Sequence, residues 1–142
     1  TFERGITMAN KARQIASGSF TSAATSVSDT FSIEPNTKQI TLLGKFDRGA
    51  SGGTAVKAYL QTTFDDGTTW QDVACIVFAT TSAQKLISVA KDSKLAAVAG
   101  TDGTLADDTA NAFFGQKWRL KMISTGTYVG PATLAAFIYE SN

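Results

Sequence analysis

The sequence contains no histidine, a single cysteine (Cys75) and only two prolines among its 142 residues. Without histidine, a Ser-His-Asp triad, a Cys-His pair and a histidine-ligated zinc site are all excluded by inventory. One cysteine cannot form a disulfide within the chain. No apolar run approaches the roughly 18 residues that a membrane-spanning helix requires. These absences predict a protein that is not an enzyme, holds no cofactor and does not contact a membrane.

Charge of either sign is also scarce. The chain has 13 Lys+Arg against 12 Asp+Glu, and charged residues make up 18% of it. A protein that binds nucleic acid by neutralising phosphates needs a basic stretch, and none is present, so no direct contact with nucleic acid is expected. What is abundant is small and polar: 20 Thr, 12 Ser and 12 Gly. A hydrophobic content of 43% still suffices for one buried core.

From Ser19 onward the apolar residues recur with a period of two, which is typical of half-buried strands. The pattern is clearest in residues 55–64, where Val56, Ala58 and Leu60 fall on one face. Strands are predicted over residues 27–33, 39–46, 55–64, 70–80, 85–90, 116–124 and 133–139, whereas residues 91–115 fit no regular element. The sequence therefore predicts an all-β domain over residues 19–142, an antiparallel β-sandwich of jelly-roll or Greek-key type.

Residues 1–18 differ from the rest because their apolar residues are sparse. We predict that they form an N-terminal arm that docks on its own domain or on a neighbour, with a frayed tail as the alternative. Residues 8–16 have the composition of a short helix. Deletion of residues 1–18 is expected to spare the fold and to weaken partner binding. The partner-binding candidates in this arm are Phe2, Arg4, Ile6, Lys11 and Arg13.

Two groups of aspartates are candidates for a calcium site or for a hydrolytic carboxylate pair. Calcium requires six to eight oxygens at a defined spacing, and neither group matches such a loop. Each group includes an Asp-Gly turn, for which turn chemistry is a sufficient reason. We therefore expect no metal at these turns. The residues concerned are Asp65, Asp66 and Asp72 in the first group, and Asp102, Asp107 and Asp108 in the second.

Cysteine and aromatic side chains are the remaining candidates for a site. Cys75 lies in a nearly continuous apolar run without a cationic neighbour, which predicts a buried structural thiol. Four aromatic residues suggested a sugar-binding platform, although Trp118 is in phase with core positions and a residue such as Trp70 commonly packs over its hairpin turn. The four are Tyr59, Trp70, Trp118 and Tyr128.

Residues 58–89 contain LQTTFDDGTTW followed by DVACIVFATT, and residues 100–128 contain TDGTLADDT and STGTY. These stretches cover about half of the chain. They resemble small virion proteins of tailed bacteriophages, in which a strand of the form LQTSxDGGxTW precedes DVAxFxFTT and a later TDGxLADxT loop.

The resemblance is strongest to head decoration or cement proteins, which clamp neighbouring capsid subunits from outside. It implies that the major capsid protein of the same phage is the partner, and that the chain forms a homo-oligomer, a dimer or trimer. It further implies a location on the capsid surface of the virion after assembly in the host cytoplasm. The alternatives are a neck or tail component of a phage, or a carbohydrate- or receptor-binding β-sandwich module.

Overall fold

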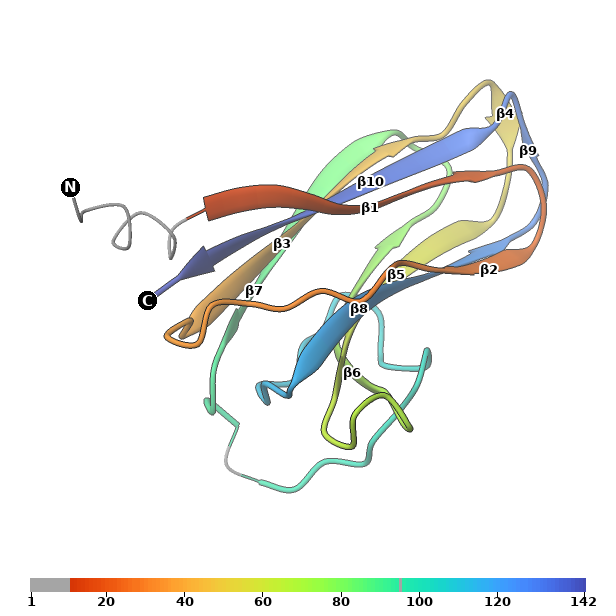
Figure 1. Ribbon diagram of the computed structural model, residues 1–142. Coiled ribbons are helices and arrows are strands. Elements are labelled where there is room, and N and C mark those ends of the chain that lie inside the picture. Colours follow the sequence, from red (N-terminus) through yellow and green to blue (C-terminus); the bar gives the residue numbers. More distant parts are fainter. Residues whose placement is uncertain (1–10, 95) are drawn as a thin grey trace.

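The computed structural model describes residues 11–94 and 96–142, and every regular element within them is a β-strand (Figure 1). No helix in these ranges is long and apolar enough to cross a membrane. The strands, in chain order, are β1 (Lys11–Phe20), β2 (Ala24–Val27), β3 (Gln39–Asp47), β4 (Ser51–Gly52), β5 (Ala55–Thr63), β6 (Gln71–Phe78), β7 (Ala83–Ala90), β8 (Lys117–Thr125), β9 (Tyr128–Val129) and β10 (Ala132–Ser141).

Two four-stranded antiparallel sheets pack against each other, which confirms the predicted all-β sandwich (Figure 1). The first sheet has the order β1-β10-β3-β7 and the second has the order β2-β8-β5-β6. Strands β4 and β9 form a separate two-stranded ribbon at one end. Among the eight strands of the two sheets, the chain changes sheet at every connection except the β5–β6 hairpin.

The core lies between the sheets and is built from alternate residues of each strand. On β10 the inward side chains are Leu134, Ala136 and Ile138, while on β8 they include Leu120 and Met122. These residues are almost wholly inaccessible to solvent, as the period of two predicts. Burial of each large apolar side chain contributes roughly 1.5–3 kcal/mol to the stability of the fold.

The structure differs from the sequence pattern at two places. The strand predicted over residues 27–33 ends as a continuous strand at Val27. Beyond it the chain stays beside β8 only through an isolated bridge between Phe31 and Trp118, and then crosses to β3 in the first sheet. Phe31 and Ile33 lie half-buried against the core along this crossing, which produced the misleading alternation. The composition of residues 8–16 is that of a short helix with too little apolar surface to be stable alone, and residues 11–16 are instead extended in β1. Pairing with β10 supplies their backbone hydrogen bonds, and so tertiary context overrides a weak local preference.

The predicted boundary of the N-terminal arm also requires correction. Residues 11–18 lie within the sandwich, because β1 pairs with β10 from Lys11 opposite Glu140 to Phe20 opposite Ala132. Deletion of residues 1–18 would therefore remove an edge strand of the first sheet. Residues 1–10, including the candidates Phe2, Arg4 and Ile6, lie outside the described residues.

The long connection between β7 and β8 closes the free edge of β6. The amide of Asp72 donates to the carbonyl of Thr101 (2.8 Å), and that of Cys75 donates to the carbonyl of Thr109 (2.9 Å). The amide of Asn111 in turn donates to the carbonyl of Val73 (2.6 Å). An open strand edge is a template for aggregation, so this connection protects the second sheet at that side.

Candidate functional site

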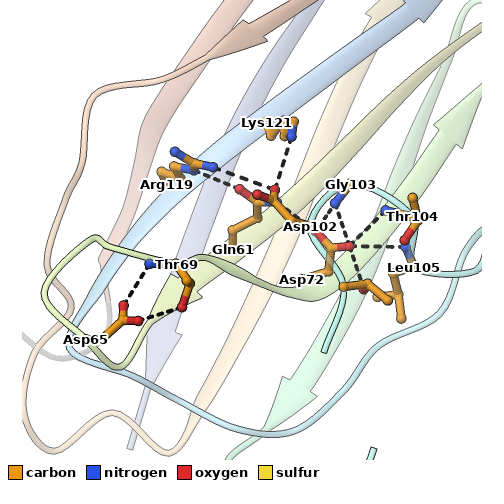
Figure 2. Close-up of polar contacts among 11 residues, drawn as sticks. Gln61, Asp65, Thr69, Asp72, Asp102, Gly103, Thr104, Leu105, Arg119 and Lys121 are labelled. Atoms are coloured by element: carbon orange, nitrogen blue, oxygen red, sulfur yellow. Dashed lines mark hydrogen bonds and ion pairs between the residues drawn. The ribbon is translucent and has the colours of Figure 1, made fainter. Parts of the chain in front are cut away.

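Asp72 is the most heavily hydrogen-bonded carboxylate among the described residues (Figure 2). It is buried at the start of β6 and accepts a hydrogen bond from Gln61 Nε2 (2.8 Å). Four further donors come from the connection between β7 and β8: the hydroxyl of Thr101 (2.7 Å) and three backbone amides, those of Gly103, Thr104 and Leu105 (2.8–3.1 Å). With its oxygens occupied in this way, Asp72 anchors the connection to the sheet.

A second carboxylate, Asp102, extends this network over the outer face of the second sheet (Figure 2). It accepts hydrogen bonds from Gln61 Nε2 (2.7 Å) and Lys121 Nζ (3.1 Å), and Arg119 lies 3.7 Å away. The Arg119 guanidinium also stacks 4.4 Å from the centre of the Trp70 ring. Partial burial raises the pKa of Asp102, but the Gln61 hydrogen bond and the Lys121 and Arg119 charges outweigh it and lower this pKa below its ordinary value.

We expect acidification to weaken this contact. Because the folded-state pKa of Asp102 is lowered, its carboxylate stabilises the fold above the unfolded value of 3.8, and this contribution disappears as the pH falls through the folded value. The free energy of unfolding should therefore drop more steeply between pH 5 and pH 2 in the wild type than in Asp102→Asn. The difference should stay under about 1 kcal/mol, because half of the side chain is exposed. Urea titrations across that range measure it, and parallel curves would contradict the prediction.

The remaining aspartates of the two groups accept hydrogen bonds within a turn or form ion pairs with lysines, and their carboxylates do not converge on one point. Asp65 accepts hydrogen bonds from the amide and hydroxyl of Thr69 (2.9 and 2.6 Å), and its pKa is lowered by them. The other ion pairs are Asp66–Lys117, Asp107–Lys57 and Asp108–Lys85. Within residues 11–94 and 96–142, no three Asp, Glu, Cys or His side chains are placed to hold a metal ion together.

All four aromatic residues of the sugar-platform hypothesis are buried, so they cannot form an exposed platform. Trp118 packs in the core against Phe114, with ring centres 5.2 Å apart. Tyr128 donates its hydroxyl to the carbonyl of Ala79 (2.9 Å). Cys75 is buried as predicted, and burial raises the pKa of its thiol to about 11, which keeps it protonated and unreactive at neutral pH.

Arg13, a predicted partner-binding residue, is engaged within the domain. Its guanidinium lies 3.1 Å from the buried carboxylate of Glu140, 5.5 Å from the centre of the Phe31 ring, and donates to the carbonyl of Ser32. Glu140 also accepts from the amide of Glu34 (2.8 Å). Arg13 thus joins β1, β10 and the crossing segment, rather than reaching away from the sandwich.

The outer face of the first sheet differs from that of the second. We call it the open face, and define it as the side of β1, β10, β3 and β7 that points away from the core. At its centre Leu43, Leu86 and Phe137 lie in one row across neighbouring strands, with Tyr139 beside them. Leu86 is 67% exposed and Tyr139 is 43% exposed. From Ala12 onward, the charged side chains that these strands turn to this face are Lys45 and Asp47.

A shallow groove of about 780 Å³ crosses one end of the open face. Its floor is formed by small side chains on β1 and β10, and Lys45 and Asp47 of β3 stand along it. The small residues are Ser17, Gly18, Ser19, Thr133 and Ala135. The face therefore combines protruding apolar side chains with a hollow, and it is poor in charge.

The sequence contained part of the signal for the open face. The alternation of residues 133–139 sets Phe137 and Tyr139 opposite the core positions, although outward positions of a solvated strand are normally polar. The pattern does not predict which of the two outer sheet faces is covered by a connecting segment of the chain. A comparison with known protein families finds no match, and a search of curated proteins finds none either.

Proposed function

We propose that the protein is a non-enzymatic virion structural protein of a tailed phage, which binds the outside of the capsid and stabilises contacts between shell subunits. The observation that carries the proposal is the difference in covering and in exposed side chains between the two outer faces of the sandwich. The carboxylates of Asp72 and Asp102 hold the β7–β8 connection over the outer face of the second sheet. The other face carries an apolar row of Leu43, Leu86 and Phe137 at its centre. Lys45 and Asp47 are the charged side chains of strands β3, β7 and β10 on this face, and the Lys45 ammonium lies 5.2 Å from the centre of the Phe137 ring. An exposed apolar patch with few charges is expected of a contact surface.

The strand order supports the finer assignment to the jelly-roll type. Eight strands form two four-stranded sheets, and the chain alternates between them at six of seven connections. Jelly rolls recur in viral capsid proteins and in lectins, so the fold is compatible with the proposal and does not by itself select it. The lectin alternative loses its motivation, because the aromatic residues that suggested it are buried.

Partner binding by the N-terminal segment is tested by deletion of residues 1–10, which leaves β1 and the Arg13–Glu140 ion pair in place. We expect the shortened chain to retain its melting temperature and to lose most of its association with phage heads. Purified heads stripped of the protein are mixed with each version and sedimented, and the bound copies per shell subunit are counted. Equal binding by both versions would contradict the role of residues 1–10.

The same experiment separates the proposed location from its alternative. Full-length protein should sediment with heads and raise the temperature at which they release DNA. Binding to purified tails or necks instead of heads would show that the protein belongs to that part of the particle. Failure to bind any part of the virion would overturn the proposed function.

A further inference from the structure

Strand β7 is a free edge of the first sheet. Within the described part of the chain it pairs with β3 alone. The amide of Lys91 donates to the carbonyl of Lys38 (2.8 Å), which continues the register of β3 with β7. Since the backbone groups of a strand point alternately to its two sides, those of Gln84, Leu86 and Ser88 point away from β3. Each of these residues therefore offers one N–H and one C=O at the side of the sandwich.

The other edges of the two sheets are less suited to further pairing. The β7–β8 connection covers the edge of β6, and β2 is only four residues long. The register of β1 shifts between Gln14 and Ala16, and such a bulge disrupts pairing at an edge. β7 runs in unbroken register from Ala83 to Ala90, so it is the edge best able to accept another strand.

Two hollows lie beside this edge, where the gap between β7 and β6 opens at the side of the sandwich. One has a volume of about 250 Å³, and its lining includes Ile76 and Ile87. The other has a volume of about 310 Å³, and its lining includes Phe78 and Ala83. Lys85 lines both, so the hollows follow one another along β7 on the two sides of this residue.

We propose that β7 accepts an extended segment of a partner protein by strand addition, with apolar side chains of that segment in the two hollows. Hydrogen bonds to the free backbone groups of β7 would supply affinity, and the hollows would select the side chains. Alternate side chains of an added strand lie on one side of it, roughly 7 Å apart, and so face the same gap as Ala83, Lys85 and Ile87. The source of the segment, a shell subunit, rests on the proposed function.

The charge of Lys85 selects against a second copy of β7 as the added strand. Its ammonium lies 3.2 Å from the carboxylate of Asp108 and 5.7 Å from the centre of the Phe78 ring. An antiparallel second β7 centred on Leu86 would set its own Lys85 opposite Ile87, and two ammonium groups would then compete for one carboxylate. A charge that points inward at an edge discourages such indiscriminate pairing. An apolar strand of a different protein avoids the repulsion.

The first test removes the edge donors and leaves the open face comparable. The double variant Gln84→Pro/Ser88→Pro lacks two outward N–H groups but keeps every bond to β3. Its matched control, Gln84→Ala/Ser88→Ala, loses the same side chains and keeps the N–H groups. In sedimentation with stripped phage heads, the proline variant should need at least about ten times more protein for half-saturation than the control. Thermal denaturation verifies that both are folded, and equal binding by the two would overturn the proposal.

Hydrogen exchange in the unaltered chain provides a second test. NMR should show rapid exchange at the amides of Gln84, Leu86 and Ser88 in the free protein, and slow exchange at Lys85 and Ile87. Exchange while the chain is bound to heads, followed by release, should slow the first three amides by about tenfold or more. A chain that binds heads without this protection overturns the strand addition alone, whereas a chain that binds no heads overturns the proposed function with it. Protection that appears on concentration without heads would identify a second copy as the occupant and refute the proposal.

Discussion

Replacement of Asp72 by alanine is expected to lower the free energy of unfolding by about 3–5 kcal/mol. The carboxylate is buried and receives hydrogen bonds from a side-chain amide, a hydroxyl and three backbone amides, so its removal leaves several donors without an acceptor. For a chain of this length the melting temperature should fall by roughly 10 °C or more. Chemical denaturation and differential scanning calorimetry measure the two quantities.

We also expect the effect of this substitution to be localised in the connection between β7 and β8. Hydrogen exchange at the amides of Gly103, Thr104 and Leu105 should accelerate, because these amides lose their acceptor and the loop is released from the sheet. Asp107→Ala is the matched control, since it removes an exposed carboxylate of the same connection that pairs only with Lys57. It should change the free energy of unfolding by less than about 1 kcal/mol. If the two variants were equally stable, the role of Asp72 as an anchor would be wrong.

A large steric effect is expected at Gly53. This residue has φ of +87°, and an added Cβ would fall inside the van der Waals envelope of the Tyr128 ring. The ring cannot withdraw, because its hydroxyl is bound to the carbonyl of Ala79 and its edge packs against Phe46. We expect Gly53→Ala to cost about 3–5 kcal/mol, the sum of backbone strain and overpacking.

Gly67 supplies the control for that substitution. Its φ of +91° is nearly the same, but an added Cβ there would meet nothing closer than Trp70 Cζ2 at 4.0 Å. Gly67→Ala should therefore cost only the backbone strain, about 1–2 kcal/mol. The difference between the two variants in urea denaturation isolates the clash with Tyr128. A similar loss in the free energy of unfolding for both variants would show that the Tyr128 ring moves to accommodate the added Cβ.

The strands that could be predicted from the sequence are those that pack one face on the core. Residues 39–46, 55–64, 116–124 and 133–139 alternate clearly, and their structural counterparts β3, β5, β8 and β10 begin and end within one or two residues of the prediction. β1 could not be predicted, because its partner β10 lies more than a hundred residues away and its own sequence carries little alternation. The hydrogen bonds that make it a strand depend on where β10 lies.

The candidate site was less predictable for a similar reason. Asp72 was considered as a calcium ligand beside Asp65 and Asp66, yet its donors come from residues 101–105. No local pattern connects the two segments. The difference between the two outer faces depends on the same connection, which crosses the outer side of the second sheet and not that of the first. Tertiary structure determines which of the two outer faces the β7–β8 connection covers. The alternation of residues within a single strand carries no information about this.

The position of β10 has a consequence for how the protein folds. The last strand of the chain lies in the interior of the first sheet, between β1 and β3, and pairs with both along nearly its whole length. During synthesis the first and third strands emerge long before the strand that joins them. The first sheet therefore cannot close until translation has passed residue 141, and the pairings that close it are of long range in sequence. Folding should accordingly be slow, and the edges of β1 and β3 that β10 covers stay open to aggregation until it has joined them.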